Sequence, residues 1–346
     1  MTQMIATNLK TPAESTQPRK PARPDILLGI RPEAFTAAMI AIVAIVVAII
    51  NPDFLQVGTL FDILRSSTVT GIFALGVLVV LAAGGIDVSF TAIAALTMYS
   101  ITKAVALWWP HAPMPLIFLA GALGGVLLGI LNGRLVDWLK APSLIVTIGT
   151  QYLFRGFLLT FVGTVFLMEI PDPMDSFGRA ALMRHATEQG ALSVLPASVV
   201  ILVVAAALTW FILNRTLIGR AVYAIGGSLN IAERLGYKLS VVHMFVFGYA
   251  GLLAGVAGIV HVSSNRLANP FDLVGTELDV IAAVVLGGAR ITGGNGTVLG
   301  TMLGVILVTL INNVLILMGV PSTLQKVIVG AFILAAGALF SIRRSR

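Results

Sequence analysis

Residues 70–107 decide the fold, and they read TGIFALGVLVVLAAGGIDVSFTAIAALTMYSITKAVAL. Two apolar runs, 70–85 and 88–107, flank a short polar break that contains Asp87. The second run has the ~20 residues that an α-helix needs to cross a bilayer, whereas the first is short for that length. A charged residue at membrane depth costs about 2.5–3.5 kcal/mol on insertion scales. The stretch therefore predicts two membrane-spanning helices joined by a break that has a structural or functional use.

The whole chain shares this apolar character. Its 346 residues are 58% hydrophobic and 11% charged, with a mean hydropathy of +0.99, whereas soluble domains are about 45–50% apolar and 25% charged. We expect an all-α, polytopic integral membrane protein with about ten transmembrane helices. The apolar segments run over residues 35–50, 70–85, 88–107, 115–134, 143–162, 193–213, 241–261, 277–290, 297–318 and 323–341.

The polar start of the chain differs from the rest. Residues 1–33 are rich in Pro, Thr, Ser, Lys and Arg, a composition typical of a disordered tail. We expect a cytoplasmic N-terminal tail over 1–33 and a transmembrane domain over 34–346.

Basic residues predict the orientation of the spans. With ten spans and the N-terminus inside, most of the 22 Lys and Arg residues fall in cytoplasmic loops and tails. Both termini are then expected to be cytoplasmic. The long loop 163–192 falls outside and is acidic, whereas the loop 214–240 falls inside and is basic.

A weak internal similarity suggests an inverted repeat. Residues 131–133 (Leu-Asn-Gly) precede a Pro-Ser pair at 142–143, and residues 311–313 (Ile-Asn-Asn) precede another at 321–322. The offset of about 180 residues corresponds to five spans, which reverses direction across the membrane.

The break around Asp87 has two compatible interpretations. Asp87 or Ser89 can cap the following helix by accepting hydrogen bonds from its first turn, or both can form a polar wall of a substrate path. The other polar residues assigned to such a path, as a hypothesis, are Asn132, Gln151, Asn312 and Asn313.

The inside loop contains a predicted short helix. Ser228 or Asn230 can cap it, and Gly236 can end it. Because so short a helix is unstable alone in water, it is suited to docking in a partner's groove, although a solvated positive-inside loop is an alternative.

Residues 277–297, ELDVIAAVVLGGARITGGNGT, form a third motif. Its glycines resemble a phosphate loop only superficially, because no Gly-Lys pair occurs in the chain, so a Walker A site is absent. Any ATP hydrolysis must come from another chain. The chain has no cysteine, and its four histidines lack metal-site spacing. We therefore expect no metal, no cofactor and no enzyme, and the basic charge reflects inside loops and not nucleic-acid binding.

Four motifs carry a resemblance to a known family: GGIDVSF at 84–90, SLIVTIGT at 143–150, Gly-Arg-Ala-Val-Tyr-Ala-Ile-Gly-Gly at 219–227 and the stretch 277–297. In this order they resemble the permease subunits of bacterial ABC importers of the ribose, rhamnose and autoinducer-2 type. The similarity covers nearly everything after residue 35. GGIDVSF departs from the commoner GGIDLSVG form, and VPSTLQ and IGTQYLFRG are somewhat nearer the autoinducer-2 branch.

The resemblance implies a type II importer in the bacterial inner membrane. It would move a monosaccharide or a related small polyol or furanosyl solute by alternating access. Its partners would be a cytoplasmic ABC ATPase, a periplasmic sugar-binding protein, a second permease subunit (identical or homologous) and membrane lipid. The ATPase-coupling position matches the segment Ala232, Glu233, Arg234, Leu235 and Gly236.

Two other classes of protein compete with this importer. A secondary, ion-coupled transporter also has inverted repeats and polar midplane residues, but it usually needs an ion site within its spans. A membrane-embedded enzyme would need paired carboxylates, a metal cluster or a nucleophile beside a base, and the sequence has none at useful spacing.

The predicted topology can be tested with a single cysteine, because the chain contains none. Ser176→Cys lies in the loop 163–192, so it should react with a membrane-impermeant thiol reagent in intact cells. Labelling is measured before and after lysis, with the cysteine-free chain as control. Labelling only after lysis would invert the topology.

Overall fold

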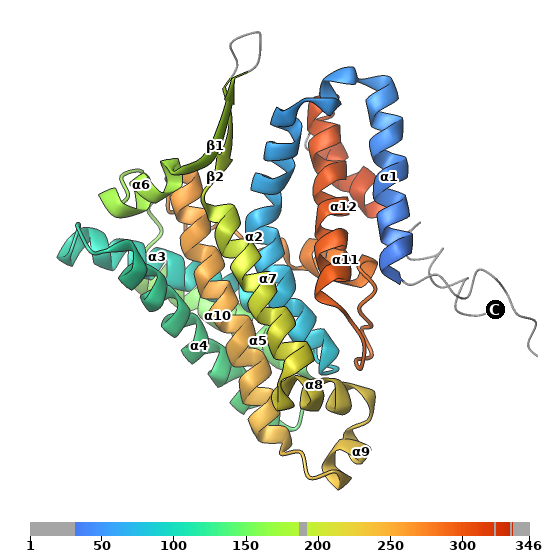
Figure 1. The fold of residues 1–346 in the computed structure, drawn as a ribbon. Helices are drawn as coiled ribbons and strands as arrows, with labels where there is room; N and C mark the ends of the chain where they lie inside the picture. Colours follow the sequence, from blue (N-terminus) through green and yellow to red (C-terminus); the bar gives the residue numbers. More distant parts are fainter. Residues whose placement is uncertain (1–31, 187–191, 322, 333, 335–346) are drawn as a thin grey trace, which may run out of the picture. The chain divides into compact units, whose positions relative to one another are not determined.

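The computed structural model describes residues 32–186, 192–321, 323–332 and 334 (Figure 1). The expected tail, 1–33, lies outside the described residues apart from its last two, and it stays a prediction. Helix α1 begins at Pro32, two residues before the expected transmembrane domain at 34.

The described chain is almost entirely helical. Its α-helices are α1 Pro32–Ile50, α2 Val57–Ala82, α3 Phe90–Trp108, α4 Met114–Leu139, α5 Ser143–Phe157, α6 Asp172–Arg179, α7 Ser198–Arg215, α8 Leu217–Gly227, α9 Leu229–Arg234, α10 Leu239–Asn265, α11 Glu277–Leu286 and α12 Val298–Leu317. A 3-10 turn, Pro52–Leu55, precedes α2, and a π-helical turn, Leu158–Val162, extends α5. One further apolar helix is Thr323–Phe332.

Eight helices of the described chain are long and apolar enough to cross a membrane: α1, α2, α3, α4, α5 with its π-helical extension, α7, α10 and α12. They confirm the all-α, polytopic fold. One expected segment is much shorter than a span. Residues 277–290 contain only the ten-residue α11, which spans about 15 Å and so covers half of a bilayer core. The segment 323–341 begins as a helix over Thr323–Phe332, and most of its remainder lies outside the described residues.

Helix α2 begins well before the expected residue 70. Its first turns carry Asp62 and Arg65, which lower the local hydropathy. For this reason the apolar segment expected from the sequence begins too late. Both side chains are exposed. The true helix has 26 residues and becomes continuously buried from Gly71 to Ala82.

The long loop that starts at residue 163 contains two elements that were not expected. Helix α6 is followed by an antiparallel hairpin, β1 Ala181–Ala186 paired with β2 Leu192–Pro196. Figure 1 shows α6 and the hairpin at one end of the helices and α8 and α9 at the other. The loops 163–192 and 214–240 therefore lie at opposite ends, as their opposite charge predicted.

Glycines bring α4 and α10 into backbone contact. Gly121, Gly125 and Gly129 recur every fourth residue of α4, and a Cβ on Gly125 would collide with the backbone of Gly251. A Cβ on Gly255 would likewise collide with Gly121. Small residues at this spacing permit close helix packing in membranes. Helix α10 also packs on α2 and α3 and so forms the centre of the core.

The outer helices present apolar side chains outward. Ile45 on α1, Leu127 on α4, Tyr152 on α5 and Val203 on α7 are all at least 60% exposed. Such large exposed apolar area on helices of membrane length faces lipid and not water. Membrane lipid therefore surrounds these helices.

Candidate functional site

The break after α2 folds around Asp87. Gly84 adopts a left-handed φ of 82°, which glycine tolerates without steric cost, and the chain reverses there. The Oδ1 atom of Asp87 accepts hydrogen bonds from the backbone N of Ser89 at 2.7 Å and from its Oγ at 2.6 Å. An aspartate that bonds its own chain two residues on forms an Asx turn.

The expected capping geometry is wrong in detail. Ser89 occupies the N-cap position of α3, but its side chain makes no capping hydrogen bond. Asp87 bonds the N-cap residue itself, because the turn places the carboxylate beside Ser89 and not beside the first helical turn. The Asp87 side chain therefore shapes the turn that leads into α3 and does not cap the first turn of that helix.

Helices α4 and α5 hold this break from both sides. The Nδ2 atom of Asn132, on α4, donates to the Oγ of Ser89 at 2.6 Å. On α5, Ser143 Oγ accepts from the backbone N of Ile86 at 2.8 Å, and Thr147 Oγ1 accepts from that of Val88 at 3.3 Å. The structure thus joins three predicted residues, Asp87, Ser89 and Asn132, all at most 2% exposed.

Two oxygens of this cluster keep free lone pairs. Asp87 Oδ2 and Asn132 Oδ1 are buried without a hydrogen-bond partner among the described protein atoms. A buried acceptor left unpaired costs about 1–3 kcal/mol. Each of these two oxygens can therefore still accept a hydrogen bond.

Gln151 belongs to a second cluster, which sequence reasoning missed. Its Nε2 atom donates to Oε1 of Glu277 at 2.5 Å, and Thr91 Oγ1 donates to the same oxygen at 2.5 Å. Glu277 is 7% exposed. The available signal was a carboxylate at the start of a Gly-rich apolar segment, which membrane energetics marks as costly unless it is partnered.

Asn312 lines a polar cavity, whereas its neighbour Asn313 does not. The cavity has a volume of about 390 Å³ and lies among α2, α10, α11 and α12. Its polar lining residues are Arg65, Ser66, Thr68, Thr70, His261, Ser264, Asn265, Thr276, Thr309, Asp279 and Asn312. Asn313 instead donates from Nδ2 to the backbone O of Thr309 in its own helix, at 2.9 Å.

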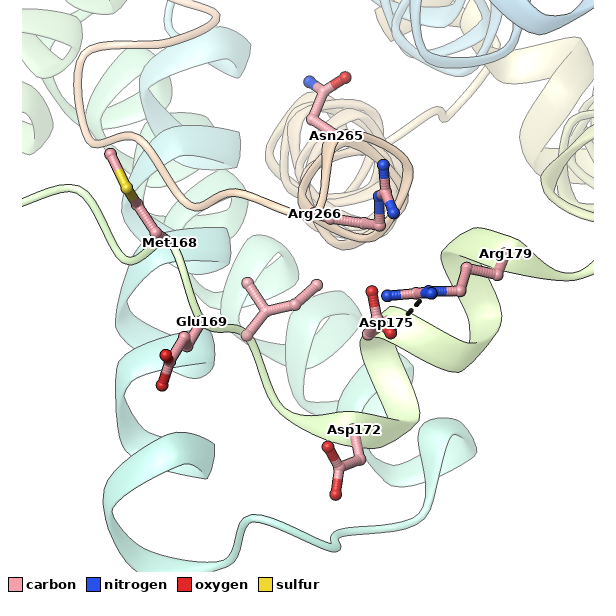
Figure 2. A pocket seen from close by; sticks show the side chains of 8 residues that line it. Met168, Glu169, Asp172, Asp175, Arg179, Asn265 and Arg266 are labelled. Atoms are coloured by element: carbon pink, nitrogen blue, oxygen red, sulfur yellow. Dashed lines mark ion pairs between the residues drawn. The ribbon is translucent and has the colours of Figure 1, made fainter.

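A second cleft, of about 520 Å³, opens beside α6. Figure 2 shows Asp175 and Arg179 on α6 facing the end of α10, where Asn265 and Arg266 lie. Asp175 and Arg179 form an ion pair at 2.8 Å. Because Asn265 lines both this cleft and the cavity that contains Asn312, the two spaces adjoin at that residue.

The loop 214–240 forms the short helix that was expected. Helix α9 starts after Ser228, whose side chain makes no capping bond, and Gly236, at a φ of 84°, ends it. Ala232 is fully buried and anchors the helix, whereas Glu233, Arg234 and Leu235 are exposed. Leu229 and Ile231 are exposed as well, so α9 offers a mixed apolar and charged surface.

Within the described part of the chain, no group of three or more His, Asp or Glu side chains is arranged to hold a metal ion.

Replacing Asp87 tests the role of its two oxygens. Asp87→Asn keeps the Oδ1 acceptor for Ser89, so it should fold and retain most solute uptake. Asp87→Leu leaves the buried N–H of Ser89 unpaired, at about 1–3 kcal/mol, and should lose most uptake. Both are measured as uptake per folded protein, with Asp62→Leu at the exposed end of α2 as control. Failure of the folded Asn variant would mean that the charge itself is required.

Comparisons with known proteins agree with this architecture. A family model described as "Branched-chain amino acid transport system / permease component" matches residues 59–337. The ribose import permease proteins of Haemophilus influenzae and Bacillus subtilis are 33% and 34% identical to the chain, over 86% and 85% of it and 90% and 88% of their own lengths.

The autoinducer 2 import system permease protein of Yersinia enterocolitica is 31% identical over 86% of this chain and 79% of its own length. No solved structure matches the chain. The expectation of an ABC importer subunit, and not an enzyme, is confirmed: the chain belongs to this family of transport-system permease components and is a multi-pass protein of the inner membrane.

Proposed function

We propose that the chain carries a monosaccharide, or a related small polyol or furanosyl solute, through the cavity that contains Asn312. The observation that carries the proposal is a partly open cavity of about 390 Å³ among α2, α10, α11 and α12, in which hydroxyl, amide and charged side chains gather on otherwise apolar helices. Ligand sites are concave, and a few convergent polar groups fix the ligand within them. The volume lies within the range of small-molecule pockets, about 300–1,000 Å³.

The lining of the cavity suits a neutral polyhydroxyl solute. The hydroxyl of Thr309 and the amide of Asn312 can each donate and accept, as solute hydroxyls also do. The hydroxyl of Thr68 donates to the backbone O of Leu64 and can still accept. Phe73 adds an apolar surface. The names of the relatives, which are permeases for ribose and autoinducer 2, support the same solute class.

The path we propose enters through the cleft at α6, passes Asn265 and reaches the cavity. The buried cluster of Asp87, Ser89 and Asn132 borders this path in another conformation, where the unpaired oxygens of Asp87 and Asn132 can receive solute hydroxyls. Asn313 has no part in this path, because its amide is bonded within α12.

We propose that partners bind at both ends of the helices. A cytoplasmic ATPase subunit docks on the exposed residues of α9, with Ala232 as the buried anchor and Gly236 as the helix end. A periplasmic solute-binding protein docks on α6 and the hairpin. A second permease subunit, identical or homologous, completes the pathway, and both termini are cytoplasmic. The opposite positions of α6 and α9 support docking of these two partners on opposite sides of the membrane (Figure 1).

Adjacent asparagines provide a matched test of the cavity. Asn312→Leu removes the amide and places an apolar side chain in the cavity, so uptake of the solute should fall about tenfold, equivalent to about 1.4 kcal/mol. Asn313→Leu makes the same chemical change outside the cavity and should stay within about twofold of the unaltered chain. Uptake is measured in proteoliposomes that contain the assembled importer. Equal effects of the two substitutions would exclude the cavity as the solute site.

The ATPase contact has its own test. Replacing Glu233 and Arg234 together by Ala should leave insertion and folding intact, because both side chains are exposed. It should lower uptake and weaken the stimulation of ATPase activity by loaded binding protein, since polar contacts fix the orientation of a docked partner. Reconstituted ATPase activity is measured with and without loaded binding protein. Unchanged stimulation and uptake would remove both residues from the contact.

A further inference from the structure

The carboxylate of Glu277 connects three separate elements. It is the first residue of α11, and its Oε1 accepts from Thr91 of α3 and from Gln151 of α5, both at 2.5 Å. The backbone N of Gly275 donates to both carboxylate oxygens, at 2.9 and 3.0 Å. Hydrogen bonds to an ionised acceptor are about twice as strong as neutral ones. This one side chain therefore gathers α3, α5 and the loop before α11.

The two flanks of α11 are held in different ways. On one flank the helix packs against α12 and α2. There the backbones of Ala283 and Gly304 approach so closely that a Cβ on Gly304 would collide with Ala283. Toward α3 and α5, Glu277 supplies two side-chain hydrogen bonds. Apolar packing thus fixes α11 to α12, and exchangeable hydrogen bonds fix it to α3 and α5.

No ion pair of the described chain includes Glu277. Its charge is balanced by hydrogen-bond donors, which water or a solute hydroxyl can replace when the helices separate. A buried ion pair would be harder to separate, because breaking it leaves an uncompensated charge. The hydrogen bonds of Glu277 are therefore strong while α11 lies against α3 and α5. Water or a solute hydroxyl can replace them when these helices separate.

The opposite end of α11 leads to the ATPase side. The loop after α11 carries Gly293 and Gly294, whose added Cβ atoms would meet the backbone of Gly226 on α8. The hydroxyl of Tyr223, also on α8, donates to the backbone O of Gly296 at 2.7 Å. A displacement of α8 is therefore passed to this loop and to α11, two of whose residues, Asp279 and Val280, line the solute cavity.

We propose that Glu277 is a positioning residue that acts as a latch: it holds α11 against α3 and α5 in this conformation and releases α11 when the ATPase subunits move α8. The proposal rests on the proposed function for its coupling to transport. The contact between positions 151 and 277 is independent of which solute is carried. Release of the latch changes the wall of the cavity without disturbing the packing of α11 on α12.

A reciprocal exchange tests the latch in the assembled importer. Gln151→Glu places two carboxylates together and should lower the amount of solute carried per ATP at least tenfold, while the complex still assembles and hydrolyses ATP. Adding Glu277→Gln restores one carboxylate and one amide and should return the ratio to within about twofold. An unchanged ratio in Gln151→Glu, or no recovery in the double exchange, would overturn the latch.

A milder pair of variants covers the case in which Gln151→Glu fails to assemble. Thr91→Val removes one donor at nearly constant volume and should lower the solute carried per ATP several-fold, whereas Thr91→Ser keeps the donor and should not. If the hydrogen bond of Thr91 only stabilises the fold, Thr91→Val should lower the amount of folded protein. The importers that remain should then carry the normal amount of solute per ATP. That outcome would also overturn the proposal.

Thermal unfolding of the purified chain separates this proposal from the function as a whole. A double-mutant cycle over positions 151 and 277 should show an interaction, with the double exchange unfolding at a higher temperature than Gln151→Glu alone. This result does not depend on transport. If the unaltered importer carries no sugar but the cycle shows the interaction, the proposed solute is wrong and the contact stands. Additive unfolding temperatures would refute the contact itself.

Discussion

The backbone contact between α4 and α10 is the constraint on which the rest of the structure depends. Lipid supplies no hydrophobic force between helices, so close van der Waals packing must hold them together. Gly125 and Gly129 provide it by letting the backbone of α10 approach at Gly251 and Phe247. This register also places Asn132, at most one turn further along α4, against Ser89 in the break before α3. A shift of α4 along α10 would separate that pair.

The chain segments that follow α2 and α11 pack against each other and against α8 through glycines. Gly84 follows α2, Gly293 follows α11, and both lie against Gly226 of α8. The backbone N of Gly294 donates to the backbone O of Ala82 at 3.0 Å, which satisfies a carbonyl at the end of α2. Irregular backbone at membrane depth is tolerated only where protein or an internal cavity satisfies it. The glycines meet that requirement by letting these backbones lie in direct contact with α8.

Much of this architecture could be predicted from sequence, because lipid imposes apolar length on each span. The break at 84–90 and the helix ending at Gly236 were also readable, since each has a local turn signal. What was missed depends on tertiary contacts. The start of α2 was not predicted, because its charged residues lower the hydropathy there. Helix α6 and the β1–β2 hairpin were not predicted either, because lipid does not require a fixed apolar length of them. Asn312 and Asn313 have the same side chain, and only the rotation of α12 places one in the cavity and the other outside it.

The two buried carboxylates differ in what they hold together, and this difference separates fixed from movable parts. Asp87 bonds Ser89, two residues away, so its contact persists however the helices shift. Glu277 bonds Thr91 and Gln151, which lie 186 and 126 residues away in sequence, so its contact exists only while α11, α3 and α5 are together. A local turn cannot report a change in helix packing, whereas a contact among three helices must form or break with it. The break at Asp87 is therefore suited to a constant wall and the contact at Glu277 to the part that changes.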